Sequence, residues 1–278
     1  MQGSGSTSGQ GTGSPLSQEQ LSSLAERVDT AAMQGRAIVK LSAELERLSW
    51  GDAYTIQRLS MQRRFARGER LVGMKMGLTS KAKMLQVNVD SPIYGHLTSD
   101  MQRSSGDALH MSEQIHPRVE PEIAFIVGDR PVRGKITAAQ AWGYIDGVCA
   151  AIEVIDSRYE RFEFTLPDVV ADNASSTRFF LGDLVKKPHE IKELVGNLGM
   201  IMEIDGEARQ VGSSAAILEH PIRSFVALVE MLDALGEELA PGSIVLAGAA
   251  TAAEFVSAGQ HVCLKTDGLG EVHLHVKP

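Results

Sequence analysis

The sequence predicts an α+β protein in which a helical N-terminal lobe precedes a β-rich core. Two observations indicate this class. The first patterned segments repeat apolar residues at helical spacing, and from residue 70 onward short apolar runs alternate with Gly, Pro and Asp-Gly turns. A chain of 278 residues that is 43% hydrophobic and 22% charged can also bury a full core.

The beginning of the chain differs in composition from the rest. Residues 1–15 are rich in Gly and Ser and carry too little apolar surface to offset the entropy lost on ordering, so we expect a flexible tail. Beyond it, the patterns divide the chain into a helical lobe at 16–70 and a β-rich domain at 71–278.

Two helices are predicted in the lobe. Ser17 and Gln20 have capping-box spacing before an amphipathic stretch, and Ser49 and Asp52 repeat this arrangement before the second helix. Gly68 is expected to end the second helix, because glycine readily adopts the left-handed conformation found at helix C-termini.

In the β-rich domain, turn residues predict two hairpins, around Asp205-Gly206 and around residues 267–270. One clear helix is expected between them, beginning at Pro221 and ending at Gly236. Its predicted apolar stripe contains Phe225, Leu228, Val229, Leu232 and Leu235.

Charge and composition favour small-molecule chemistry. The net charge of −8 and the absence of a Lys/Arg-rich run argue against a nucleic-acid or membrane partner, since both require clustered positive charge. No apolar run approaches the length of a membrane span and no secretory signal is visible, so a cytoplasmic protein is expected. Cys149 and Cys263 lack metal-binding spacing and are interpreted as reduced core residues.

Three glutamates are the strongest candidates for a functional site. Glu120 and Glu122 lie two residues apart in the predicted strand RVEPEIAFIV, so both point to the same face. Glu153 lies in the apolar run VCAAIEVI, where an unpaired carboxylate would cost several kcal/mol. The acids are therefore solvated, paired with Arg or Lys, or gathered around a cation. Oxygen ligands without His or Cys fit Mg²⁺ or Mn²⁺ better than zinc.

Four segments, GMKMGLTS, PRVEPEIAF, AIEVIDSRY and VVADNASSTRF, resemble the hydratase/decarboxylase branch of the fumarylacetoacetate hydrolase superfamily. The resemblance extends from about Leu16 to the C-terminus and is greatest to decarboxylases of 2-oxo-3-hexenedioate. It implies a mixed β-roll core with an N-terminal helical lobe, and it places catalysis in residues 71–278.

The resemblance also implies roles for particular residues. Glu120, Glu122 and Glu153 match the family's carboxylate ligands of Mg²⁺, which Mn²⁺ sometimes replaces. Lys75 matches the lysine that lines the active site, where it could balance charge or donate a proton. A surface ammonium is the alternative for Lys75, although its apolar neighbours make this less attractive.

The implied reaction is decarboxylation of the 2-oxo dicarboxylate 2-oxo-3-hexenedioate to 2-hydroxypenta-2,4-dienoate and CO₂ in the meta-cleavage degradation of aromatic compounds. Alternatives are a vinylpyruvate hydratase on the same scaffold, a non-catalytic metal-binding partner subunit and, more weakly, a carbon–carbon bond hydrolase. The resemblance further implies a homo-oligomer and a complex with the hydratase, which would shelter an unstable dienol.

Substrate contacts are predicted in two segments. Ile93 and Tyr94 of SPIYG stand where hydratases of the branch carry an acidic residue; an isoleucine cannot act as a base, so decarboxylation is preferred. Arg158 or Arg178 could bind a substrate carboxylate, and Asp172 could order the loop that faces the metal. A core position for Ile93, and ion pairs of the arginines with nearby aspartates, are the alternatives.

Overall fold

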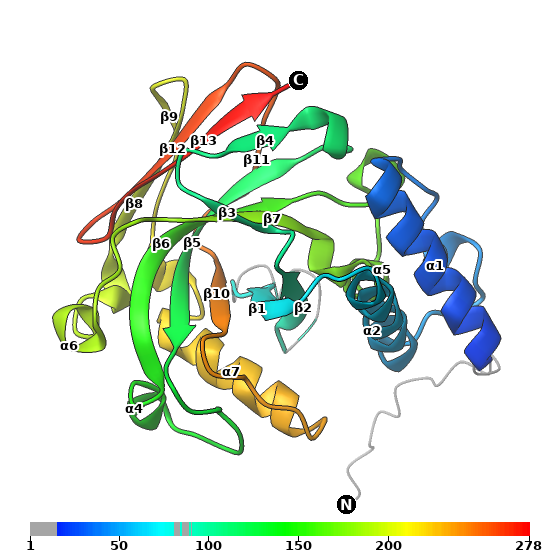
Figure 1. Ribbon diagram of the computed structural model, residues 1–278, viewed down its shortest axis with the longest axis horizontal. Coiled ribbons are helices and arrows are strands. Elements are labelled where there is room, and N and C mark those ends of the chain that lie inside the picture. Colours follow the sequence, from blue (N-terminus) through cyan, green and yellow to red (C-terminus); the bar gives the residue numbers. More distant parts are fainter. Residues whose placement is uncertain (1–15, 81–83, 85–88, 90) are drawn as a thin grey trace, which may run out of the picture.

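The computed structural model describes residues 16–80, 84, 89 and 91–278. The predicted tail at 1–15 lies outside the described residues. Over those residues the chain folds into two sheets with helices packed around them, which confirms the predicted α+β class (Figure 1). No helix in the described ranges is both long enough and apolar enough to span a membrane.

The N-terminal helices begin where the capping residues predict. In α1 (Gln18–Gln34), Ser17 and Gln20 form the capping box; in α2 (Trp50–Ala66), the Ser49 hydroxyl accepts from the Asp52 N–H. Gly68 follows α2 with φ +100°. These two helices lie side by side and pack with α5 (Leu166–Ala171) over an apolar cluster (Figure 1).

The larger sheet contains eight strands in the described part of the chain and mixes parallel with antiparallel pairs. Seven follow the order β2 (Ile93–Thr98), β1 (Leu71–Gly77), β10 (Ile244–Ala249), β5 (Arg118–Val127), β6 (Ile145–Ile155), β7 (Ser176–Leu181) and β3 (Gln102–Ser104). The short strand β11 (Glu254–Phe255) pairs with β5 beside this path. The division at residue 70 stays a prediction, although β1 does begin at Leu71.

The second sheet has the order β4 (Ala108–His110), β13 (Gly270–Lys277), β12 (His261–Thr266), β8 (Gly199–Ile204) and β9 (Glu207–Ser213). Both predicted hairpins are confirmed, since β8 pairs with β9 around Asp205-Gly206 and β12 pairs with β13 around residues 267–269. The main apolar core lies between the two sheets and under α7 (Pro221–Asp233).

The helix α7 begins at Pro221 as predicted and buries four residues of the expected stripe. Leu235 is the exception, because the helix ends at Asp233 and leaves that side chain 52% exposed. The sequence patterns did not predict three short helices, α4 (Ala138–Ala141), α5 and α6 (Pro188–Ile191). They also did not predict the 3₁₀ turns at Leu41–Ala43, Met111–Glu113, Glu160–Phe162, Asn173–Ser175, Val195–Asn197 and Ser214–Ala216. Both cysteines are buried and unpaired, as predicted.

The packing of Phe225 leads to one quantitative prediction. Phe225 is fully buried and its ring meets Phe125 edge to face at 5.9 Å, so it joins α7 to β5. Phe225→Ala should lower the free energy of unfolding by about 3–5 kcal/mol, measured by urea denaturation. Leu235→Ala is the control and should change it by less than about 0.5 kcal/mol. Equal losses in the two variants would contradict this packing.

Candidate active site

Strand pairing gathers the three glutamates. Glu120 of β5 stands directly opposite Glu153 of β6, and Glu122 lies two residues further along the same face of β5. One carboxylate oxygen from each can be chosen so that all three lie within 4.8 Å of one another. Glu122 and Glu153 are fully buried, whereas Glu120 is partly exposed.

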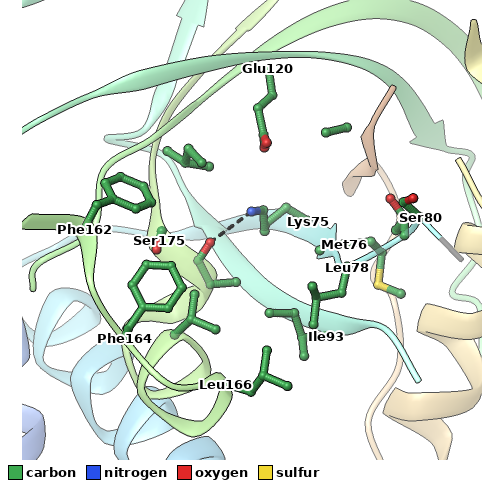
Figure 2. A pocket seen from close by; sticks show the side chains of 16 residues that line it. Lys75, Met76, Leu78, Ser80, Ile93, Glu120, Phe162, Phe164, Leu166 and Ser175 are labelled. Atoms are coloured by element: carbon green, nitrogen blue, oxygen red, sulfur yellow. Dashed lines mark hydrogen bonds between the residues drawn. The ribbon is translucent and has the colours of Figure 1, made fainter. Parts of the chain in front are cut away.

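Lys75 reaches the same place from β1. Its ammonium lies 2.9 Å from Glu153 Oε2 and donates a hydrogen bond of 3.0 Å to the Ala174 carbonyl (Figure 2). Burial lowers the pKa of Lys75, but the charges of Glu153, Glu122 and Glu120 outweigh burial and leave that pKa above its ordinary value. Lys75 is therefore a buried ammonium, not a surface one.

A strained turn supplies the acceptor for Lys75. Asn173, Ala174 and Ser175 all have positive φ, between 50° and 59°, a conformation that costs free energy in non-glycine residues. The Asn173 side chain holds this turn to β2, because it accepts from the His96 N–H at 2.7 Å and donates to the His96 carbonyl at 2.9 Å. Ser176 then donates to Glu153 Oε1 at 3.2 Å.

Glycine is required on the opposite side of the cluster. The Gly248 N–H donates to Glu122 Oε2 at 2.8 Å from a backbone with φ +107°. A Cβ atom there would lie 2.2 Å from the Thr79 hydroxyl oxygen. Only glycine can combine this conformation with this close approach.

The cluster fits a divalent cation. The buried carboxylates of Glu122 and Glu153 share the ammonium of Lys75, and burial, reinforced by the charge of Glu153, raises the pKa of Glu122 well above its ordinary value. Glu122 Oε1 is buried and accepts no hydrogen bond from the described residues, and Glu153 Oε2 lies near Lys75 outside hydrogen-bond geometry. A hard cation would satisfy both oxygens and neutralise the excess charge, as all-oxygen sites for Mg²⁺ do.

A cavity of about 170 Å³ opens onto Lys75 and Glu120. Figure 2 shows both side chains pointing into it, with Phe162 and Phe164 along one wall. Lys75 and Glu120 are the ionisable groups among its described lining residues. The apolar lining side chains are Met76, Leu78, Ile93, Ile155, Phe162, Phe164, Leu166, Val169, Ala174 and Ala249.

Ile93 and Tyr94, the two SPIYG residues predicted to contact substrate, point to different faces of β2. Ile93 lines the cavity and is 3% exposed. Tyr94 alternates to the other face of β2 and stacks on Tyr54 of α2, with ring centroids 4.8 Å apart. Ile93 therefore faces this cavity and Tyr94 does not.

The arginines predicted to bind substrate lie elsewhere. Arg158 is buried in an ion pair with Asp172, whose pKa burial raises to about 6 despite the adjacent guanidinium. Arg178 pairs with Glu113 at 2.8 Å, and both arginines line a different cavity. The placement of the two arginines argues against a substrate contact and favours the alternative of an aspartate ion pair for Arg158. Asp172 directly precedes the turn Asn173–Ser175, so its predicted role in ordering that loop stays a prediction.

A cation that the sequence did not indicate lies beside the cavity. Arg118 precedes Glu120 by two residues on the same strand face, and its guanidinium stacks between the rings of Phe162 and Phe255, at 4.1 and 3.9 Å. Its buried Nε donates no hydrogen bond among the described residues. Strand alternation could have indicated the position, but neither aromatic partner is close to Arg118 in sequence.

Known proteins resemble this chain over most of its length. A 4-oxalocrotonate decarboxylase from Pseudomonas sp. is 44% identical over 252 residues, which cover 91% of this chain and 96% of that protein. A 2-keto-4-pentenoate hydratase from Burkholderia vietnamiensis is 35% identical over 256 residues, covering 91% and 95% respectively.

The fold is shared as well. A solved structure of 4-oxalocrotonate decarboxylase from Pseudomonas putida G7, complexed with magnesium and adipate, matches with a TM-score of 0.91 at 38% identity and covers 94% of this chain and 99% of that chain. Residues 72–277 match the family described as fumarylacetoacetate (FAA) hydrolase C-terminal. The chain therefore belongs to the fumarylacetoacetate hydrolase family.

Proposed function

We propose that the protein is a metal-dependent carboxy-lyase that converts 2-oxo-3-hexenedioate (4-oxalocrotonate) to 2-hydroxypenta-2,4-dienoate and CO₂. The observation that carries the proposal is the cluster of three glutamates and Lys75 at the end of an apolar cavity. The similarity to proteins named 4-oxalocrotonate decarboxylase, at 38–44% identity, supports the same reaction.

Glu120, Glu122 and Glu153 are the residues that would hold the cation, with Mg²⁺ as the proposed ion and Mn²⁺ as a substitute. Solved structures of a related decarboxylase are described as complexed with magnesium and with calcium, two cations that prefer oxygen ligands. When bound, such an ion supplies Lewis-acid polarisation of the 2-oxo group.

Lys75 is the proposed source of the proton. Loss of the distal carboxylate as CO₂ breaks one carbon–carbon bond and leaves its electron pair in a dienolate that ends on the 2-oxo oxygen. One proton on that oxygen completes 2-hydroxypenta-2,4-dienoate. Lys75 lines the cavity as a buried ammonium. Among the described lining residues, it is the group that could donate this proton.

The apolar walls favour decarboxylation over hydration. A carboxylate loses its charge as it becomes CO₂, so a poorly solvating wall such as Ile93 and Leu166 destabilises the ground state more than the transition state. The two arginines predicted to bind substrate lie away from these walls. Arg118 is the cation that we propose offsets the charge of the dianionic substrate at the mouth of the cavity.

Hydration of 2-hydroxypenta-2,4-dienoate is the second candidate, because relatives named as hydratases are 31–35% identical to this chain. The resemblance implies that hydratases of this branch carry an acidic residue near the position of Ile93, and an isoleucine cannot transfer protons to or from water. A non-catalytic partner subunit is disfavoured, because Lys75 and all three glutamates are present.

We also propose that the enzyme acts in the cytoplasm as a homo-oligomer and associates with the vinylpyruvate hydratase of the same degradation route. The physical reason is the product: a conjugated dienol tautomerises readily, and direct transfer to the next enzyme shortens its exposure to water.

One assay tests the reaction. The purified protein with Mg²⁺ is incubated separately with 2-oxo-3-hexenedioate and with 2-hydroxypenta-2,4-dienoate, while CO₂ release and loss of the dienoate chromophore are followed. We expect CO₂ from the first compound and no hydration of the second. Hydration without CO₂ release would establish the hydratase instead.

Glu122→Gln should abolish Mg²⁺-dependent turnover and leave the fold intact. A metal ion contributes several kcal/mol to catalysis, and each 1.4 kcal/mol is tenfold in rate, so kcat should fall by about 100-fold or more. Calorimetric Mg²⁺ titration should show weakened binding, and circular dichroism should be unchanged. The control is Glu207→Gln, an exposed glutamate of β9. Full activity in Glu122→Gln would remove the ligand assignment.

Lys75→Ala should lower kcat by about 10²–10⁴-fold, the range of general acid–base catalysis, while changing Mg²⁺ affinity by only a few-fold. Steady-state kinetics and metal titration separate the two effects. Lys187→Ala, at an exposed lysine paired with Asp146, is the matched control. An unchanged kcat in Lys75→Ala would make Lys75 a bystander.

A further inference from the structure

A second group of metal-ligating side chains lies on the other sheet. Strand pairing places His261 opposite His275 and Cys263 opposite His273 on β12 and β13. Val262, Leu264, Val272 and Leu274, which alternate with them, belong to the main core. The histidines and Cys263 therefore share the face of the second sheet that points away from that core.

The side chains on this face converge. Ligand atoms of Cys263, Glu271 and His273 all lie within 4.8 Å of one another. His273 Nε2 is 3.2 Å from a Glu271 carboxylate oxygen, and His273 Nδ1 is 3.2 Å from His261 Nε2. The His261 ring is stacked on His273 and His275, with centroids 5.3 and 4.7 Å apart.

We propose that Cys263, Glu271 and His273 bind a borderline transition-metal ion of the Zn²⁺ class. Sulfur and imidazole ligands select Zn²⁺ or Co²⁺ over Mg²⁺, so this site differs in chemistry from the all-oxygen glutamate cluster. His261 acts as a positioning residue, because its hydrogen bond to the second ring nitrogen of His273 fixes the orientation of that ligand.

The geometry is compatible with a three-ligand site open to solvent. Glu271 is exposed and His273 is partly exposed, so both can close on an ion by rotation, while Cys263 is held in the sheet and 6% exposed. The fourth tetrahedral position would be taken by water. An ion here would cross-link β12 to β13 and hold the last strand of the chain to its neighbour.

Cobalt provides a direct probe, because thiolate ligation produces a charge-transfer absorption that oxygen ligands do not. The full-length protein, carrying Glu122→Gln to suppress binding at the glutamate cluster, is titrated with Co²⁺ and then with Zn²⁺. We expect a thiolate-to-cobalt band that saturates at one equivalent per chain and disappears when Zn²⁺ displaces the Co²⁺.

Variants in that background assign the ligands. Cys263→Ser should abolish the band, and His273→Ala should weaken Zn²⁺ affinity by at least about 10-fold. The controls are Cys149→Ala, at the other cysteine, and His189→Ala, at an exposed histidine of α6; both should keep the band. A band that survives Cys263→Ser, or binding without any thiolate band, would overturn the proposal.

These metal-binding measurements do not depend on decarboxylation. Cys263→Ser alone should retain Mg²⁺-dependent turnover, and Zn²⁺ should raise the Tm of Glu122→Gln but not of Glu122→Gln combined with Cys263→Ser. Equal Zn²⁺-induced shifts in the two proteins would count against the site, whatever substrate the enzyme uses.

Discussion

The burial of two carboxylates, Glu122 and Glu153, beside the ammonium of Lys75 is the constraint on which the site depends. Glu122 and Glu153 are both fully buried, and like charges at this distance oppose ionisation. The fold tolerates them because strand pairing, a backbone N–H from Gly248 and the hydroxyl of Ser176 fix their positions. Two buried carboxylates beside one ammonium leave a deficit of positive charge, which is why the cluster fits a divalent cation.

Next to this cluster, a strained backbone turn positions a hydrogen-bond acceptor for Lys75. Three successive residues with positive φ bring the Ala174 carbonyl to Lys75, and Asn173 holds that turn against β2 through paired hydrogen bonds. Such strain persists only when the surroundings fix it. Here the surroundings are the helical lobe, because α2 contacts both β2 and α5 through Gln57, whose amide donates to Tyr94 and Val170 carbonyls. The N-terminal lobe thus supports the site without supplying a residue to the cluster.

Local patterns predicted the elements well, since caps, hairpin turns and strand alternation act over a few residues. Alternation placed Glu120 and Glu122 together, and the apolar run around Glu153 indicated that it needs a partner. Lys75 was predicted only from the family resemblance, because nothing near it in sequence shows that β1 joins this sheet. Gly248 and Ser176 were missed for the same reason: their partners are distant in the chain. Charge alone suggested Arg158 and Arg178, but packing paired them with acids.

The cluster bears on both roles proposed for Lys75, the stabilising ion pair and the proton donor. The three glutamates raise the pKa of Lys75 against the opposing effect of burial, so the resting enzyme holds the proton firmly. If these carboxylates held a divalent cation, less of their negative potential would reach Lys75, and the opposing effect of burial on its pKa would weigh more. Proton transfer is most efficient when the pKa of the donor is near the working pH. In the proposed reaction, cation binding would thus favour proton donation through the same three side chains.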